Sequence, residues 1–200
     1  MKIRADFHIH SCLSPCGDLE MSPRIIANIL SEKNISIAAL TDHNSALYCT
    51  AFKIFCEEKN ILPLFGMEVQ TSEELHALTL FASLDDALAF SQFWFRTLPR
   101  IPNKAEITGD QVFVKEHDEI LSEVKNYLVC SSRLSLDLCA RLVHDRGGLI
   151  IPAHVDRPAF SLTSQLGDIV SGDWDALEFV NAQNVSAFSL AKNYPTCIFV

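Results

Sequence analysis

The sequence has 200 residues, of which 48% are hydrophobic and 20% are charged, enough apolar material for one substantial core. Thirteen Phe exclude a disordered composition, and only seven Gly with eight Pro exclude a collagen-like or low-complexity chain. The net charge of −9 predicts that most of the surface repels a phosphate backbone, so we expect no extended nucleic-acid surface.

The chain shows no pattern of membrane insertion or export. No apolar run approaches the ~20 residues that cross a bilayer, and residues 1–10 contain Asp6 and two His where a signal peptide needs an apolar segment. Seven Cys, an odd number without a C-x-x-C pair, do not form the pattern of a disulfide framework. We therefore expect reduced thiols in a cytoplasmic protein with no membrane partner.

The first part of the chain alternates between strand and helix patterns. Residues 3–9 alternate apolar and polar side chains with the period of a strand, and Ser22 followed by Pro23 predicts the start of a helix. Predicted strands at 35–41 and 61–69 flank a helix at 47–59. A strand–helix–strand repeat predicts parallel strands.

The rest of the chain adds four predicted strands and two helices. The strands are expected at 76–81, 149–153, 176–180 and 196–200, and the helices at 85–98 and 135–145. We therefore predict a single α/β domain over residues 1–200 with seven strands. The connection at about 99–134 is too long for a simple crossover, so we predict an insertion there, with a hairpin in 111–121.

Side chains that bind metals recur where the predicted strands begin or end. His8 and His10 are two residues apart in a strand, so their imidazoles leave one face about 6.5 to 7 Å apart at the Cα atoms and can converge on one cation. The other candidates of this kind are Asp42, His43, Glu68, His76 and His154. Each of them alone is equally well explained as a polar strand or turn residue. Their recurrence at one edge of the sheet favours an active site.

Other candidate ligands are ambiguous or fall away from that edge. Cys12 and Cys16 follow the first strand, and each is either a thiolate ligand or a small buried residue. His117 lies in a charged run and His144 on an amphipathic helix, so we assign neither to the site.

Five segments resemble the successive motifs of one known family. They are DFHIHS at 6–11, LTDH at 40–43, GME at 66–68, ELH at 74–76 and AHVDRP at 153–158. In this order they resemble the motifs of the PHP (polymerase and histidinol phosphatase) superfamily. The resemblance implies a distorted (β/α)7 barrel with two or three divalent ions at its carboxyl edge, which hydrolyses phosphate esters.

The resemblance also implies roles for single residues. The implied metal ligands are His8, His10, Asp18, His43, Glu68, His76 and His154. Glu68 would bridge two ions, and we expect it and His43 to be the catalytic residues. Asp18 would join His43 at a third ion, although the loop places Asp18 farther from the first motif than in most members. Imidazole and carboxylate ligands together suit Zn, Mn or Fe.

Arg157 is the candidate substrate-binding residue. The guanidinium lies three residues after His154 and is followed by Pro158, a placement that suits a bidentate contact with a phosphate oxygen. An ion pair with Asp156 is the alternative. The expected partner is a small phosphorylated substrate or nucleotide.

The chain departs from the family pattern at its end. The last family motif, an Asp-x-His after the final strand, does not occur before Val200, so we expect a fragment in which the last part of the barrel is incomplete. Two alternatives to a phosphoesterase stay open. One is a non-catalytic metal-binding PHP module with a structural or regulatory role. The other is an amidohydrolase-type metallohydrolase, which usually carries a modified Lys at the end of the fourth strand, whereas 76–81 holds no Lys.

Overall fold

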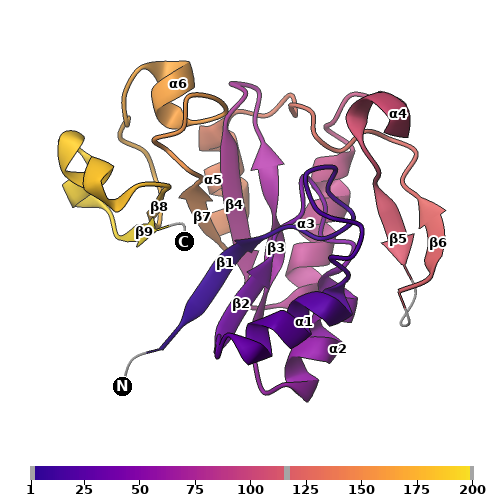
Figure 1. The fold of residues 1–200 in the computed structure, drawn as a ribbon. Coiled ribbons are helices and arrows are strands. Elements are labelled where there is room, and N and C mark those ends of the chain that lie inside the picture. The colour runs from indigo at the N-terminus through magenta and orange to yellow at the C-terminus, as the bar shows by residue number, and fades with distance from the viewer. Residues whose placement is uncertain (1–2, 115–117, 199–200) are drawn as a thin grey trace.

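The computed structural model describes residues 3–114 and 118–198 and contains a curled five-stranded sheet (Figure 1). In spatial order its strands are β1 (Ala5–Ile9), β2 (Ile37–Leu40), β3 (Leu62–Gln70), β4 (His76–Phe81) and β7 (Leu149–Pro152). β1, β2 and β3 are parallel, whereas β4 is antiparallel to both β3 and β7. The predicted parallel pairing is therefore wrong for β4, because the short 71–75 connection returns the chain as a hairpin.

The antiparallel direction of β4 decides where its first residue lies. Gln70 at the end of β3 pairs with His76 at the start of β4. His76 therefore lies at the same edge of the sheet as the carboxyl ends of the parallel strands.

At Gly66, β3 and β4 approach each other so closely that an added Cβ would lie 1.8 Å from the carbonyl oxygen of Thr79, so only glycine fits there.

The four main helices follow the predicted ranges closely. They are α1 (Pro23–Glu32), α2 (Cys49–Glu58), α3 (Leu84–Phe95) and α5 (Leu136–His144). The hydroxyls of Ser22, Ser83 and Ser135 accept hydrogen bonds from backbone N–H groups in the first turns of α1, α3 and α5. Such caps satisfy donors that the helix itself leaves unpaired.

The sheet buries apolar side chains on both faces. Met67 and Val69 of β3 belong to the cluster beneath α3 and α5, whereas Leu64 packs with the cluster on the inner face, around Leu78 and Ile151. Because side chains alternate along a strand, Glu68 faces the same side as Leu64. The carboxylate therefore lies at the end of an otherwise apolar inner face.

Segment 99–134 contains α4 (Ala105–Thr108), β5 (Val112–Val114) and β6 (Ile120–Glu123), and the hairpin of β5 and β6 stands at one side of the main sheet (Figure 1). Asn44 ties this segment to the sheet edge. Its Nδ2 donates to the carbonyl oxygens of Leu128 and Cys130, and its Oδ1 accepts from Gln70 N and Trp94 Nε1.

The C-terminal part lies on the side opposite the hairpin (Figure 1). It contains α6 (Leu162–Leu166), β8 (Leu177–Phe179), the 3₁₀ helices η1 (Ala182–Ala187) and η2 (Ala191–Asn193), and β9 (Thr196–Ile198). β8 and β9 form a parallel pair, and within the described ranges no strand ladder joins this pair to the main sheet. The observed architecture is therefore a half-barrel, with β8 held beside β7 by the hydrogen bond from Val155 N to Glu178 O. No helix in the described part of the chain is long and apolar enough to span a membrane.

Candidate metal centre

Five imidazoles surround the carboxylate of Glu68, which is 1% exposed. The ring nitrogens nearest to Glu68 lie 3.0 to 3.2 Å from its oxygens and belong to His8, His10, His43, His76 and His154. The Nε2 atoms of His8 and His10 are themselves 3.1 Å apart. The structure thus brings together six of the seven predicted metal ligands.

Each histidine reaches the centre from a strand end or from the loop after it. The pairing of β1 with β2 shifts register between Asp6 and Ile9, in the part of the strand that holds His8. Irregularities of this kind are common beside functional sites. His43 forms an isolated parallel bridge with Glu68 directly after β2. His154 follows β7 with a φ of 34°, a backbone region that few residues other than glycine occupy. Such strain is concentrated at functional sites.

Charge and burial act in opposite directions at this centre. Burial alone would raise the pKa of Glu68, but the imidazoles of His43 and His8 hold that pKa well below its usual value. Burial opposes a charged His8, yet the carboxylates of Glu68 and Glu178 raise the pKa of His8 to about 10. Burial lowers the pKa of His43 to about 3, against the attraction of Glu68, and so favours the neutral form that binds a metal.

The hydrogen bonding of the histidines suits divalent ions. Within residues 3–114 and 118–198, three buried ring nitrogens have no hydrogen-bond partner: His43 Nδ1, His76 Nε2 and His154 Nδ1. Buried polar atoms without partners are rare in folded proteins and call for a ligand or ion. Imidazole and carboxylate ligands together are the donor set of Zn, Mn and Fe sites. The residues present therefore fit the metals that the fold family uses.

Glu178, which the sequence did not single out, and Asp42, a sequence candidate outside the seven implied ligands, support the five imidazoles. Both oxygens of Glu178 lie 2.9 to 3.0 Å from His8 Nδ1, and one of them accepts from His154 N. Asp42 accepts from the hydroxyls of Ser11 and Ser14, and the Ser14 hydroxyl lies 3.1 Å from His10 Nδ1. Partners of this kind orient metal-binding imidazoles. For Glu178 the sequence signal is an acidic residue between Leu177 and Phe179 in a buried strand.

The remaining predicted residues lie at different distances from the centre. Asp18 is exposed and its carboxylate accepts from Glu20 N, so the structure does not bring it to the imidazoles. Arg157 is exposed at the rim, close enough for its charge to act on the Cys16 thiol. His144 contacts Asp173 and Asp175 instead, and His117 lies outside the described residues.

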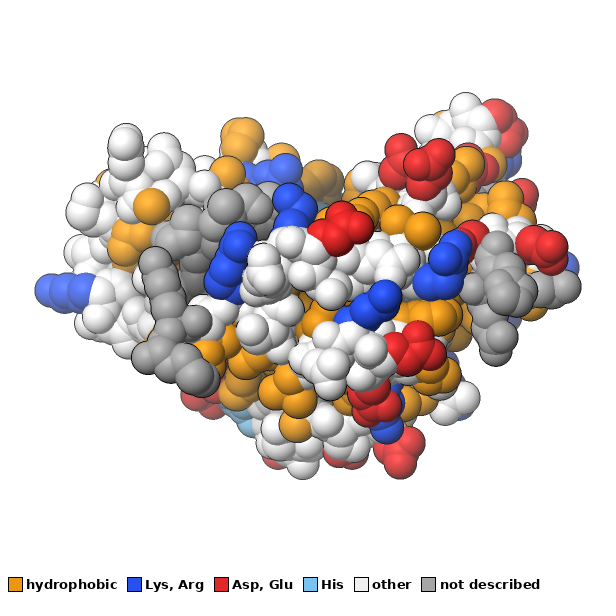
Figure 2. Space-filling view, turned by 60° about the horizontal axis from the view of Figure 1, so that its bottom comes forward, with side chains coloured by type: hydrophobic (Ala, Val, Ile, Leu, Met, Phe, Trp, Pro, Cys, Tyr) orange, Lys and Arg blue, Asp and Glu red, His pale blue; other side chains and the backbone are white. Residues whose placement is uncertain are grey.

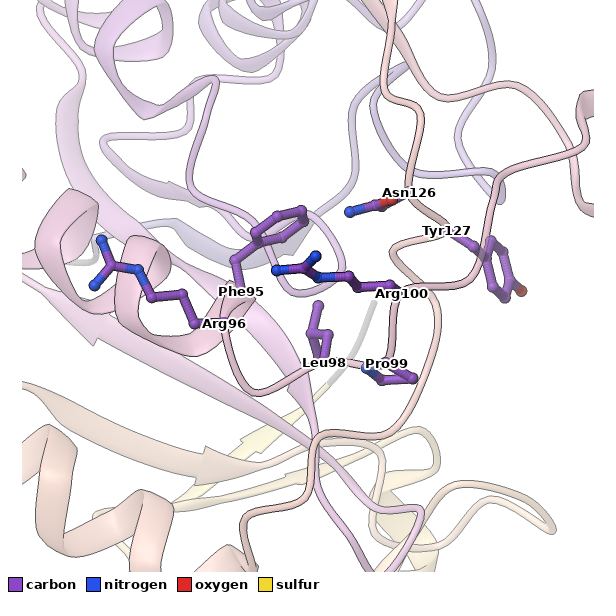
Figure 3. A pocket seen from close by; sticks show the side chains of 7 residues that line it. All are labelled: Phe95, Arg96, Leu98, Pro99, Arg100, Asn126 and Tyr127. Atoms are coloured by element: carbon purple, nitrogen blue, oxygen red, sulfur yellow. The ribbon is translucent and has the colours of Figure 1, made fainter.

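A cavity beside the end of α3 is separate from the histidines. It holds about 110 Å³ between the end of α3 and the segment that follows, and its lining includes Phe95, Arg100 and Asn126 (Figure 3). None of the residues that line it is one of the five imidazoles. The candidate site is therefore defined by its chemistry, not by the size of a pocket.

Fold and centre together define an α/β protein whose buried histidine–carboxylate cluster suits divalent metal ions. The family model of the PHP domain matches residues 6–178, so the chain belongs to the PHP domain family, and the resemblance in the sequence is confirmed. No protein of curated function matches the chain.

Solved structures share the fold at low sequence identity. The lesion-specific endonuclease EndoQ from Pyrococcus furiosus has a TM-score of 0.65 at 17% identity, over 98% of this chain and 47% of that chain. A proposed metal-dependent phosphoesterase from Bifidobacterium adolescentis has a TM-score of 0.61 at 14% identity, over 98% of this chain and 86% of that chain. Endonuclease Q in complex with a 27-mer duplex that carries an abasic lesion has a TM-score of 0.60 at 17% identity, over 97% of this chain and 47% of that chain. The chain thus spans about half the length of endonuclease Q.

The expectation of no extended nucleic-acid surface is wrong as an inference from net charge. Endonuclease Q, which has this fold, is seen bound to a duplex. Net charge is an average over the whole surface, whereas a phosphate backbone meets the local groups along its path. Figure 2 shows several Lys and Arg side chains across the middle of one face, with acidic side chains among them. The acidic composition therefore excludes no class of phosphate substrate.

Proposed function

We propose that the chain is a metal-dependent phosphoesterase whose centre is Glu68 with its five imidazoles. The observation that carries the proposal is this convergence on one buried carboxylate, from four different strands or the loops after them. The similarity of the fold to a phosphoesterase and to an endonuclease supports the reaction class. We also propose one domain over residues 1–200, with an insertion at about 99–134 on a distorted seven-stranded barrel.

In this proposal the residues of the centre have three roles: they hold metal ions, position water and orient the imidazoles. Glu68, His8 and His10 would hold one divalent ion, and Glu68, His76 and His154 would hold a second. His43 and Glu68 line the position at which water attacks. Divalent ions bound there supply Lewis acidity toward the phosphoryl oxygens and lower the pKa of water. Zn, Mn and Fe all suit this donor set. Glu178 keeps the ring of His8 oriented through its contacts with Nδ1.

We assign substrate binding to Arg157, at the rim of the centre. A guanidinium matches the geometry of a phosphate with two parallel hydrogen bonds. Since the similar endonuclease acts on DNA, we include nucleic-acid phosphodiesters among the substrates of this chain.

Hydrolysis by the purified chain with added Mn²⁺ or Zn²⁺ tests the proposal. The substrates are phosphomonoesters, nucleotides, and single-stranded and duplex DNA with and without an abasic lesion. We expect Glu68→Gln to abolish turnover and Glu58→Gln, an exposed change on α2, to leave it intact. Arg157→Ala is expected to raise KM about tenfold while the bound metal is unchanged. Metal binding without turnover of any substrate would contradict the proposal and favour the non-catalytic module.

A further inference from the structure

The loop after β1 brings one thiol to the histidine cluster. The ligand atoms of His10, Cys16 and His43 all lie within 4.8 Å of one another. Cys12, in the same loop, is buried with its Sγ 3.7 Å from the hydroxyl of Tyr48, so it belongs to the core. Of the two loop cysteines that the sequence leaves ambiguous, only Cys16 lies beside imidazoles.

Two independent features make this trio more than an isolated cysteine. The side chain of His43 is 8% exposed, and its Nδ1 has no hydrogen-bond partner although Glu68 Oε2 lies 3.0 Å away. The position of Cys16 is also fixed by the backbone. Gly17 N donates to Ser14 O, and a Cβ added at Gly17 would lie 2.1 Å from Ser11 O, so only glycine allows this turn.

We propose that Cys16 is a thiolate ligand of a divalent ion that His10 and His43 also hold, at the outer end of the Glu68 centre. Asp18, the residue expected from the family pattern to hold this ion, is exposed and bonded to Glu20 N instead. Binding transfers the thiol proton of Cys16 to solvent as the sulfur–metal bond forms. A thiolate with two imidazoles selects Zn²⁺ and Co²⁺ over Mg²⁺ or Mn²⁺. The inference rests on the metal centre of the proposed function and specifies its outer ion.

Co²⁺ is the probe that tests this ligand, because thiolate–Co²⁺ bonds give a near-ultraviolet charge-transfer band that imidazole and carboxylate ligands lack. The full chain is stripped with a chelator and titrated with Co²⁺. We expect the band in the unaltered chain and in Cys56→Ser, a buried cysteine on α2 outside the trio that serves as the matched control. We expect Cys16→Ser to lose the band and about one bound Zn²⁺ per chain, with unchanged circular dichroism.

Cys16→Asp provides a rescue that a merely structural cysteine would not show. The carboxylate should restore the ion without the band and shift preference from Zn²⁺ toward Mn²⁺ in a competition assay. Absence of the band in the unaltered chain, or its persistence in Cys16→Ser, would overturn the assignment. A chain that shows the band but hydrolyses nothing would refute the proposed activity and still support Cys16 as a ligand, so the two failures are distinguishable.

Discussion

Glu68 and Asp42 are two carboxylates buried to the same degree, each 1% exposed, in contrasting surroundings. Glu68 is ringed by imidazoles that hold its pKa well below the usual value. Asp42 is bonded to the hydroxyls of Ser11 and Ser14 and to a backbone N–H, and burial raises its pKa despite these bonds. The first region surrounds an anion with five imidazoles, whereas the second stabilises its anion mainly with hydroxyl and backbone donors, and with His10 near by.

This contrast shows that burial alone does not mark a metal centre. A buried carboxylate needs compensation, and either hydroxyl donors or cationic groups can supply it. Only the surroundings of Glu68 also leave unpaired ring nitrogens among the described residues. We therefore expect substitutions at the two carboxylates to separate metal binding from fold stability.

The largest expected effect is at Glu68. Glu68→Gln removes the negative charge among the five imidazoles, so we expect about a 10³-fold or greater loss of activity and loss of the thermal stabilisation that Zn²⁺ gives the unaltered chain. Differential scanning fluorimetry with and without Zn²⁺ measures the second effect. An unchanged Zn²⁺-dependent shift in Tm would break the comparison, since Glu68 would then be no ligand.

Glu178→Gln is expected to have an intermediate effect. The amide keeps the shape of the side chain but loses one of the two acceptor oxygens beside His8 Nδ1. Loss of such an orienting partner typically lowers metal affinity about 10- to 100-fold. Isothermal titration with Zn²⁺ measures it, and an affinity equal to that of the unaltered chain would leave Glu178 a purely structural role.

Asp42→Asn should destabilise the fold more than it affects the metal. An amide replaces an acceptor oxygen with donors that face two serine hydroxyls, so we expect the free energy of unfolding to fall by about 1–3 kcal/mol. Urea unfolding of the metal-free chain measures this loss. A drop in Zn²⁺ affinity as large as that of Glu68→Gln would erase the distinction between the two carboxylates.

The smallest effect concerns His144, a histidine among carboxylates at the surface. The bond to Asp175 raises the pKa of His144 above its ordinary 6.5, so the protonated ring stabilises the folded chain. That contribution is complete below pH 6.5 and is lost as the pH rises through the raised value. We expect His144→Gln to lower Tm at pH 5.5 and to have no effect at high pH. The corresponding loss in the free energy of unfolding should be less than about 1 kcal/mol, because the pair is partly exposed. An equal Tm difference at both pH values would contradict this account.

Local patterns predicted much of the fold and the neighbourhood of the site. The two-residue period of β1 and the capping serines are readable from the chain, and the strand ends locate Glu68 and the histidines. The 71–75 connection has five residues, too few for a crossover, so its length indicates an antiparallel β4 even though the strand–helix repeat favours parallel strands. Glu178 contacts His8 across 170 residues of sequence, and no local rule pairs them. The placement of Cys16 beside His10 and His43 depends on the turn at Gly17, which only the three-dimensional close approach reveals.

Asn44 has a consequence for any attempt to shorten the protein. One amide directly after His43 joins β3, α3 and the strand-free stretch at Leu128 and Cys130. Excision of 99–134 would remove both acceptors of the Asn44 side-chain amide and leave its N–H groups buried without partners, next to His43. Segment 99–134 therefore helps to hold the loop that carries His43, and a shortened chain would need a different residue at position 44.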